Sequence, residues 1–191
     1  MNNIVLISGS PKLKRGASYE YLNILRKYLE LKCEVISSLK YNDLDLDKIK
    51  KADTIVFSYP LYVDALPAHF LKFLKVLEGN EIKEKNVYAI CNLGYYESIQ
   101  GSISLDIIKN FCLNTNNNYM GGISIGSGPV GYLNYPFINN NIKRDLMTFF
   151  DKIDEKKTIN NMFPKSLLPR FLYLKFGNYS WNKQIRKNLL K

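Results

Sequence analysis

Five short, continuous apolar runs alternate along the chain with longer stretches in which apolar residues recur every three or four positions. The runs fall at residues 4–7, 33–36, 54–58, 86–91 and 119–125. Helical spacing follows at 18–31, 67–79, 99–112 and 139–153, and a short helix is expected within 43–53. Unbroken branched-aliphatic runs are typical of strands buried on both faces. The pattern therefore predicts an α/β fold, with a doubly wound five-stranded parallel sheet and helices on both faces.

The three loops after Ser8, Ser58 and Asn92 have unusual compositions. The first is basic and rich in small residues, whereas the other two are crowded with aromatic and apolar side chains, although loops are usually polar. In doubly wound sheets, ligands bind beyond the carboxyl ends of the strands, where the strand order reverses. These three loops are therefore the candidate ligand site.

The first loop, SPKLKRGAS at residues 10–18, has the features of an anion-binding loop. Its hydroxyl and cationic side chains are donors, and its small residues let backbone N–H groups approach a ligand where the next helix begins. The candidate binding residues are Ser10, Lys12, Arg15, Gly16, Ala17 and Ser18, the last also a candidate helix cap. Because Ala17 follows Gly16 where a lysine is needed, a nucleotide-hydrolysing P-loop is excluded. A phosphate group is the expected ligand.

The loops SYPLYVDALPA at 58–68 and NLGYYES at 92–98 suit a flat ligand. A later loop with Gly126, Gly128 and Gly131 matches the spacing of a dinucleotide-binding fingerprint, but YLNYPF follows where a helix should begin. We interpret it as a glycine-rich active-site or interface loop. The only histidine, His69, has no obvious nucleophile or acidic partner, so a structural role is favoured over catalysis.

Composition narrows the class of protein further. Of the 191 residues 46% are hydrophobic, there is no run of 18 apolar residues, and no signal peptide is recognisable, so we expect a cytoplasmic globular protein. Cys33, Cys91 and Cys112 are widely spaced in apolar surroundings and are expected in the core, without a disulfide framework or a CxxC metal site. The DLDLD segment at 43–47 lacks the glycine and glutamate of a calcium loop.

The net charge of +10 at pH 7 is concentrated at the C-terminal end. Residues 156–191 contain nine Lys and Arg and no Asp or Glu, so residues 1–155 carry only +1. Two amphipathic helices are expected there, one before Gly177 and one capped by Ser180. Docking of their apolar faces on the body or on a second subunit is favoured, and binding to an anionic membrane or nucleic acid stays open. We therefore expect a domain at 1–155 and a basic helical C-terminal extension at 156–191.

Taken together, GSPKLKRGAS, SYPLYVDALPA and NLGYYES resemble the NAD(P)H-dependent FMN reductases of the flavodoxin-like superfamily, over roughly residues 2–155. The resemblance implies a flavodoxin-like fold and FMN as cofactor, with its phosphate in the first loop. Lys12 and Ala17 stand where that family often has Arg and Asn or Ser. The residues implied to surround the isoalloxazine ring are Pro60, Leu61, Tyr62, Val63, Asp64, Asn92, Gly94 and Tyr95. Asp64 is alternatively a helix cap.

The resemblance also implies a function. Hydride from NADH or NADPH passes to FMN and then to a small-molecule electron acceptor, such as a quinone, a nitro or azo compound, a flavin or a metal ion. A homodimer is expected, and the cysteines that some relatives use for an iron–sulfur cluster are absent. The lack of a nucleophile, metal set or carboxylate pair suits an enzyme whose cofactor carries the chemistry. A non-catalytic flavin-binding sensor or a regulatory or interaction protein is the alternative that the sequence leaves open.

Overall fold

The fold is a single parallel sheet of five strands in the order β2-β1-β3-β4-β5. In a computed structural model of the chain, residues 3–13, 16–43, 46–127, 140–167 and 169–189 are described. The strands are β1 Ile4–Ser8, β2 Val35–Ser37, β3 Thr54–Pro60, β4 Asn86–Asn92 and β5 Asn118–Ile125. The α-helices are α1 Ala17–Tyr28, α2 Leu46–Lys51, α3 Ala68–Gly79, α4 Ser102–Asn114, α5 Asn140–Asp154 and α6 Arg170–Leu189, and two 3-10 helices are η2 Ser38–Asp43 and η3 Ser98–Gly101. The predicted doubly wound sheet is confirmed.

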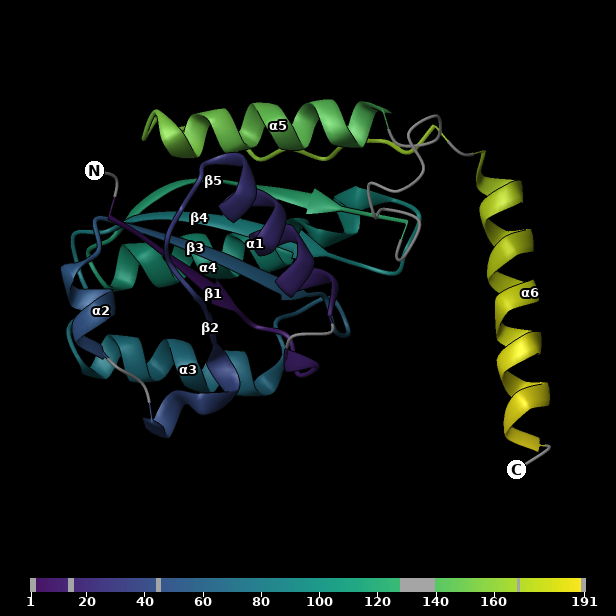
Figure 1. Cartoon of the computed structure of the whole chain (residues 1–191), viewed down its shortest axis with the longest axis horizontal. Coiled ribbons are helices and arrows are strands. Elements are labelled where there is room, and N and C mark those ends of the chain that lie inside the picture. The colour runs from purple at the N-terminus through teal and green to yellow at the C-terminus, as the bar shows by residue number, and fades with distance from the viewer. Residues whose placement is uncertain (1–2, 14–15, 44–45, 128–139, 168, 190–191) are drawn as a thin grey trace.

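Alternate residues of each strand point to opposite faces of the sheet, and each face is covered by helices (Figure 1). Ile4 and Leu6 of β1 pack in one core cluster with residues of α1 and α5. Val5 and Ile7 pack in a second cluster with residues of α2, α3 and α4. Because both faces are buried, the strands need no polar alternation, which explains the continuous apolar runs in the sequence.

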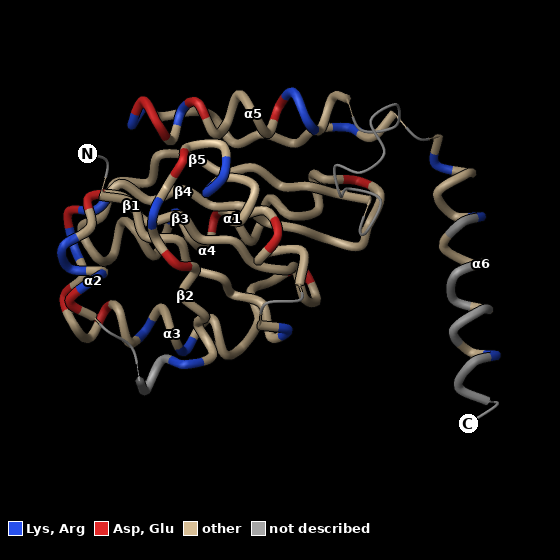
Figure 2. Tube along the Cα trace, viewed as in Figure 1, with Lys and Arg blue, Asp and Glu red and all other residues tan. Residues whose placement is uncertain are grey.

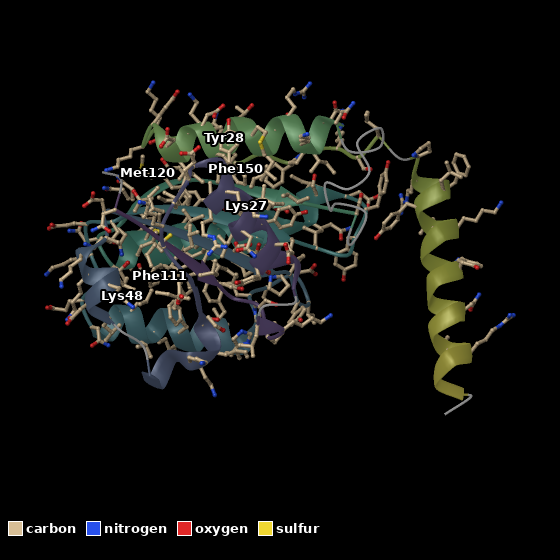
Figure 3. All side chains as sticks on the ribbon, viewed as in Figure 1. Lys27, Tyr28, Lys48, Phe111, Met120 and Phe150 are labelled. Carbon is tan, nitrogen blue, oxygen red and sulfur yellow. The ribbon has the colours of Figure 1, made fainter. Side chains whose placement is uncertain are left out.

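Aromatic side chains fill both layers between the sheet and its helices. Tyr28 at the end of α1 lies over Phe150 of α5, with ring centroids 5.8 Å apart, and its hydroxyl donates to an Asp151 carboxylate oxygen at 2.6 Å (Figure 3). On the other face Phe111 of α4 meets Phe57 of β3 edge-on, with centroids 6.4 Å apart. Full burial of a ring, as for Phe57 and Phe150, contributes roughly 1.5–3 kcal/mol to folding, and the half-exposed ring of Tyr28 contributes less. The two layers together fix α1 and α4 on opposite faces of the sheet, so that the N-termini of both helices lie toward the carboxyl ends of the strands.

The chain after α5 returns along the free edge of β5. The Ile159 N–H donates to the Met120 carbonyl and the Met162 N–H to the Gly122 carbonyl, both at 2.8 Å. Gly121 lies between them with φ +126°, and a Cβ at this position would collide with the Ile159 carbonyl oxygen. Only glycine therefore permits this close approach. The segment at 158–163 thus lies against the sheet.

Three local expectations differ from the structure. Helix α1 begins at Ala17 with Gly16 as its N-cap, so Ser18 lies inside the first turn and does not cap it. Strand β3 continues beyond Ser58 to Pro60, because it pairs with β4 along its full length. Helix α3 has Pro67 as its N-cap, so Asp64 is not its cap.

The C-terminal extension forms one long helix, α6, and the predicted pair of helices is wrong. Gly177 lies within α6 and does not end it. Figure 1 shows α6 projecting beside the sheet, and Figure 2 shows Lys and Arg along it without Asp or Glu. Described apolar residues of this helix, such as Phe171, Leu174 and Ile185, are exposed. Within the described residues, no helix combines the length and apolar character needed to cross a bilayer.

Candidate functional site

The carboxyl ends of β1 and β3 lie side by side at the point where the strand order reverses. Ser8, the last residue of β1, pairs with Ser58, and the Gly9 N–H donates to the Ser58 carbonyl at 2.7 Å. The chain leaves β1 toward β2 on one side, while β3 continues the sheet on the other. Ligands of doubly wound sheets bind at this reversal. The three loops with unusual compositions meet at this edge.

Helix α1 presents an uncapped N-terminus at this edge. Its N-cap is Gly16, and no side chain among the described residues caps it. The first N–H groups of a helix lack partners within the helix and carry partial positive charge, so they attract anions. A Cβ on Gly16 would lie 2.5 Å from the Ser10 hydroxyl oxygen. The bare glycine therefore lets the loop fold back on itself beside the helix terminus.

Two buried serine hydroxyls flank this terminus, and both have a proton left to donate. The Ser10 oxygen accepts the Lys12 N–H at 3.2 Å. Asn92 must direct its amide nitrogen to the Tyr59 carbonyl, at 2.9 Å, and the same nitrogen reaches the Ser18 oxygen at 2.8 Å. Both serine oxygens act as acceptors in these contacts, and no acceptor among the described residues takes their O–H groups, which can therefore donate to a ligand.

The donors gathered here fit a phosphate group. They combine helix N–H groups with the hydroxyls of Ser10 and Ser18, which are 3% and 1% exposed. The hydroxyl of Ser58 is also buried and has no hydrogen-bond partner within the described chain. Lys12 is exposed, where it adds positive charge at the rim. Arg15, also predicted from the sequence, lies outside the described residues.

The loop after β3 contains a strained two-residue turn. Tyr62 and Ala65 exchange backbone hydrogen bonds of 3.0 Å, and Val63 and Asp64 between them have φ of 49° and 58°. Positive φ at both central residues is the geometry of a type I′ turn, which favours Asn and Gly. A β-branched residue in this conformation is rare and strained. Neither Val63 nor Asp64 donates its N–H to a backbone carbonyl among the described residues.

The loop after β4 lies next to this turn. Asp64 and Tyr95 line one open depression of about 450 Å³, together with Gln100, Ser102 and Ile103. Tyr62 and Tyr95 are 45% and 48% exposed, and Val63 is 92% exposed. The turn and the loop thus offer aromatic and apolar surface to solvent at the same edge as the helix terminus.

Other predicted ring-contact residues have mainly structural surroundings. The side chain of Leu61 belongs to the buried core, and its N–H donates to the Asn92 carbonyl at 2.8 Å. Asn92 links the end of β4 to the start of α1 through Ser18. Pro60 is half-buried at the end of β3, and Gly94 is exposed.

The segment after β5, which the sequence predicts to be a glycine-rich active-site or interface loop, backs the β4 loop, although Ser127 is not among the predicted site residues. The Ser127 N–H donates to the Tyr95 carbonyl at 2.6 Å, and the buried Ser127 hydroxyl has no partner among the described residues. A Cβ on Gly126 would lie 2.6 Å from the Tyr96 carbonyl oxygen, so glycine is required there. The unusual glycine content of this loop was the available signal. Gly128 and Gly131, the other glycines of that motif, lie outside the described residues. Gln100 carried no signal, because an exposed glutamine before a helix is ordinary.

The titratable groups near the site are few. His69, in the first turn of α3, hydrogen-bonds the Gly9 backbone, but burial lowers its pKa below the ordinary 6.5.

Cys91 and Cys112 are buried, as predicted, and burial raises their pKa values to about 11 and about 12. Cys33 is only half-buried. Among the described residues, no cluster of His, Cys, Asp and Glu is suited to a metal ion.

Comparison with known proteins gives a structural likeness only. No family model and no curated protein matches the chain. An NADH:FMN oxidoreductase in its apo form aligns with a TM-score of 0.62 at 14% identity, over 81% of this chain and 89% of that one. A Fusobacterium nucleatum flavodoxin bound to flavin mononucleotide gives 0.59 at 13% identity, over 81% and 98%. An NADPH-quinone reductase from P. pentosaceus gives 0.55 at 12% identity, over 80% and 97%.

These likenesses agree with the strand order, because β2-β1-β3-β4-β5 is the order of flavodoxin-like sheets. At 12–14% identity they concern the backbone and not the chemistry of the site. The chain therefore has the flavodoxin-like fold, with its candidate site at the carboxyl ends of β1, β3 and β4.

Proposed function

We propose that this protein is an NAD(P)H-dependent FMN reductase that passes electrons from NADH or NADPH to a small acceptor. One observation carries the proposal. The uncapped N-terminus of α1, flanked by the buried hydroxyls of Ser10 and Ser18, shares one sheet edge with the exposed aromatic loops after β3 and β4. An anion-binding end beside a flat apolar end is what FMN, with its phosphate and its ring, requires.

The phosphate end of the site comprises Ser10, Gly16 and Ser18. Ser10 and Ser18 donate their hydroxyl protons to phosphate oxygens, since their own oxygens already accept hydrogen bonds. The helix N–H groups add donors that no side chain in the described chain competes for. Hydrogen bonds to a charged phosphate contribute about 1.5–3 kcal/mol each. This end therefore supplies most of the binding energy.

The ring end of the site comprises Tyr62–Asp64 and Leu93–Glu97. Tyr62 and Tyr95 offer aromatic faces for stacking. The N–H groups of Val63 and Asp64 are not used within their turn, so they can donate to acceptor atoms at the edge of the ring. The depression beside Asp64 and Tyr95 leaves room for the nicotinamide and then for the acceptor.

FMN held at this site would supply the redox chemistry, which is a route for hydride from the nicotinamide and for electrons to a quinone, a nitro or azo compound, a flavin or a metal ion. The chain's own residues bind and orient. His69 hydrogen-bonds the Gly9 backbone beside the phosphate end, and because burial lowers its pKa below 6.5, the neutral ring predominates at pH 7 and adds little charge there.

The absorption spectrum of the purified protein tests the proposal. FMN-loaded protein should show the two visible bands of oxidised flavin, bleach under nitrogen on addition of NADH or NADPH, and regain its colour when a quinone is added. Yellow protein that is not bleached by either nicotinamide would favour a flavin-binding sensor instead. Protein that binds no FMN at micromolar concentration would overturn both.

A further inference from the structure

The first turn of α6 contacts the loop that follows β4, although the two segments are about 75 residues apart in sequence. The Tyr173 hydroxyl donates to the Gly94 carbonyl. The rings of Tyr173 and Tyr96 lie 5.5 Å apart at 50°. One Arg170 guanidinium nitrogen lies 3.2 Å from a Glu97 carboxylate oxygen. Three contacts of different kinds thus join the basic extension to the ring end of the site.

Gly94 is exposed where the Tyr173 hydroxyl reaches the loop. A Cβ on Gly94 would meet nothing within 4 Å among the described residues. The neighbouring Tyr95 carbonyl accepts a hydrogen bond from the Ser127 N–H. The backbone at 94–95 is therefore held by two contacts, one from the segment that follows β5 and one from α6, and Tyr95 lines the depression.

We propose that Tyr173 and Arg170 are positioning residues, which hold the loop Leu93–Glu97 against the ring of FMN so that the C-terminal extension sets the affinity for the cofactor. The inference rests on the proposed function, and it gives the extension a role in the same site. Tyr173 is a positioning residue because it contacts neither the substrate nor the reacting atoms. It acts through Gly94 and Tyr95.

Tyr173 carries more of this effect than Arg170. Its side chain is half-buried, and burial together with the charge of Glu97 raises its pKa, so the hydroxyl remains a donor across the physiological range. The Arg170–Glu97 pair is exposed, with side-chain exposures of 67% and 36%. Exposed ion pairs contribute little and are screened by salt.

The remainder of α6 does not share this role. Tyr179 and Arg186 lie further along the same helix and are exposed. They resemble Tyr173 and Arg170 in chemistry, but among the described residues neither hydrogen-bonds, stacks on or pairs with the loop Leu93–Glu97. These two residues provide matched controls on the same element.

The first test uses full-length protein titrated with FMN and followed by quenching of flavin fluorescence. Tyr173→Phe, which keeps the ring but loses the hydroxyl, should weaken FMN binding about fivefold. Tyr173→Ala loses the contact with Tyr96 as well and should weaken it about 20-fold. Tyr179→Phe and Tyr179→Ala should bind FMN as the wild type does. Equal affinities for the Tyr173 and Tyr179 variants would overturn the proposal.

The ion pair is tested by charge reversal at low salt. Arg170→Glu and Glu97→Arg should each weaken FMN binding about twofold, and the double variant should recover the wild-type value. Arg186→Glu makes the same change in net charge on the same helix and should leave affinity within error of the wild type. An equal loss for Arg186→Glu would mean that overall charge, and not the pair, attracts FMN.

Two further measurements separate a positioning role from a general loss of structure. The apo-protein melting temperature should be the same for Tyr173→Phe and Tyr179→Phe, while the visible spectrum and midpoint potential of bound FMN shift only in Tyr173→Phe. Amide hydrogen exchange of the apo-protein should speed up within 93–97 in Tyr173→Ala alone. If wild-type protein binds no FMN, the proposed function fails, and the exchange result still decides whether α6 holds the loop.

Discussion

The two ends of the candidate site are built in opposite ways. At the phosphate end, Ser10 and Ser18 are buried, and each oxygen is held by a hydrogen bond from the protein. At the ring end, Tyr62 and Tyr95 are half exposed, and Val63 is almost fully exposed on a strained turn. A buried, prearranged set of donors recognises one chemical group, whereas an exposed aromatic surface accepts many flat molecules.

This difference suggests a division of labour. The phosphate end should hold FMN permanently, because its donors are ordered before the ligand arrives. The ring end should admit successive partners of the cofactor, because its surface remains open to solvent. Affinity and turnover therefore depend on different residues, and each can be altered without the other.

The largest expected effect is the loss of the phosphate from the ligand. Wild-type protein should bind FMN roughly 100-fold more tightly than riboflavin, which has the same ring but no phosphate group. In the riboflavin complex, the two serine hydroxyls and the helix terminus have no anion to bind. Ser18→Ala should reduce that preference about fivefold. Isothermal titration calorimetry with FMN and with riboflavin measures this ratio of affinities.

Tyr95→Ala is the control for this comparison, since it removes aromatic surface from the ring end. It should weaken FMN and riboflavin equally and leave their ratio unchanged. Equal affinities of the wild type for FMN and riboflavin would contradict the assignment of Ser10, Gly16 and Ser18 to the phosphate.

A smaller effect is expected when a methyl group is added at Gly16. In Gly16→Ala the Cβ would lie 2.5 Å from the Ser10 hydroxyl oxygen, which then has to turn away and release the Lys12 N–H. Overpacking of this kind costs about 1–3 kcal/mol, so FMN binding should weaken about tenfold. Gly79→Ala, where the Cβ meets nothing within 4 Å, should leave FMN binding unchanged.

A second substitution separates the effect of the steric clash at residue 16 from the loss of the Ser10 hydroxyl as a hydrogen-bond donor. Adding Ser10→Ala to Gly16→Ala removes the colliding oxygen, so the melting temperature should recover while FMN binding should not. Recovery of FMN binding in the double variant would mean that the Ser10 hydroxyl donates nothing to the ligand.

A still smaller effect, on stability alone, is expected at the ring end. Replacing Val63 and Asp64 by Asn and Gly gives the turn the residues that type I′ geometry favours. Left-handed backbone costs ordinary residues roughly 1–2 kcal/mol, so the free energy of unfolding should rise by about 1 kcal/mol. The melting temperature should rise by about 2–4 °C, as thermal unfolding would show.

Glu81→Gly is the matched control, because Glu81 also has positive φ, at 54°, but is not β-branched. Its gain in stability should be smaller than that at the turn. The preference for FMN over riboflavin should survive the turn substitution, since the phosphate end is untouched. A turn variant that is less stable than the wild type would show that the observed turn is not strained.

The fold could be predicted from the sequence because its signal is local and repeated. Each buried strand is a continuous apolar run, as at Ile4–Ser8, and each helix has its own stripe of apolar residues. Element boundaries were predicted less well: Ser18 is of a residue type that favours the cap position, but it lies inside the first turn of α1, where its oxygen accepts a hydrogen bond from Asn92. The continuity of α6 through Gly177 was missed because a glycine costs a helix only about 1 kcal/mol.

Site residues could be predicted where they lie in a loop that directly follows a strand. They could not be predicted where they belong to a distant segment such as α6. Ser10, Ser18 and Tyr95 lie in loops whose composition alone was unusual. Tyr173 meets that same edge from α6, and nothing in its local sequence points to Gly94. Contacts between segments so distant in sequence depend on the tertiary arrangement, which periodicity does not encode.

The smallest expected effect concerns His69, which lies beside the phosphate end without belonging to it. Burial lowers its pKa below 6.5, so the unfolded chain binds a proton there more readily than the folded one. The contribution of this histidine to stability is therefore complete above pH 6.5 and is lost as the pH falls from 6.5 through the lowered value. His69→Gln should remove that part of the pH dependence.

Because His69 is the only histidine, one imidazole resonance in a proton NMR titration reports its pKa directly. The midpoint should lie below 6.5 in the apo-protein. Adding FMN should raise it by a fraction of a unit, because a phosphate near Gly9 favours the charged ring, whereas riboflavin should leave it unchanged. An equal shift with both ligands would place the ring of the ligand, and not its phosphate, next to α3, and would reverse the assignment of the two ends.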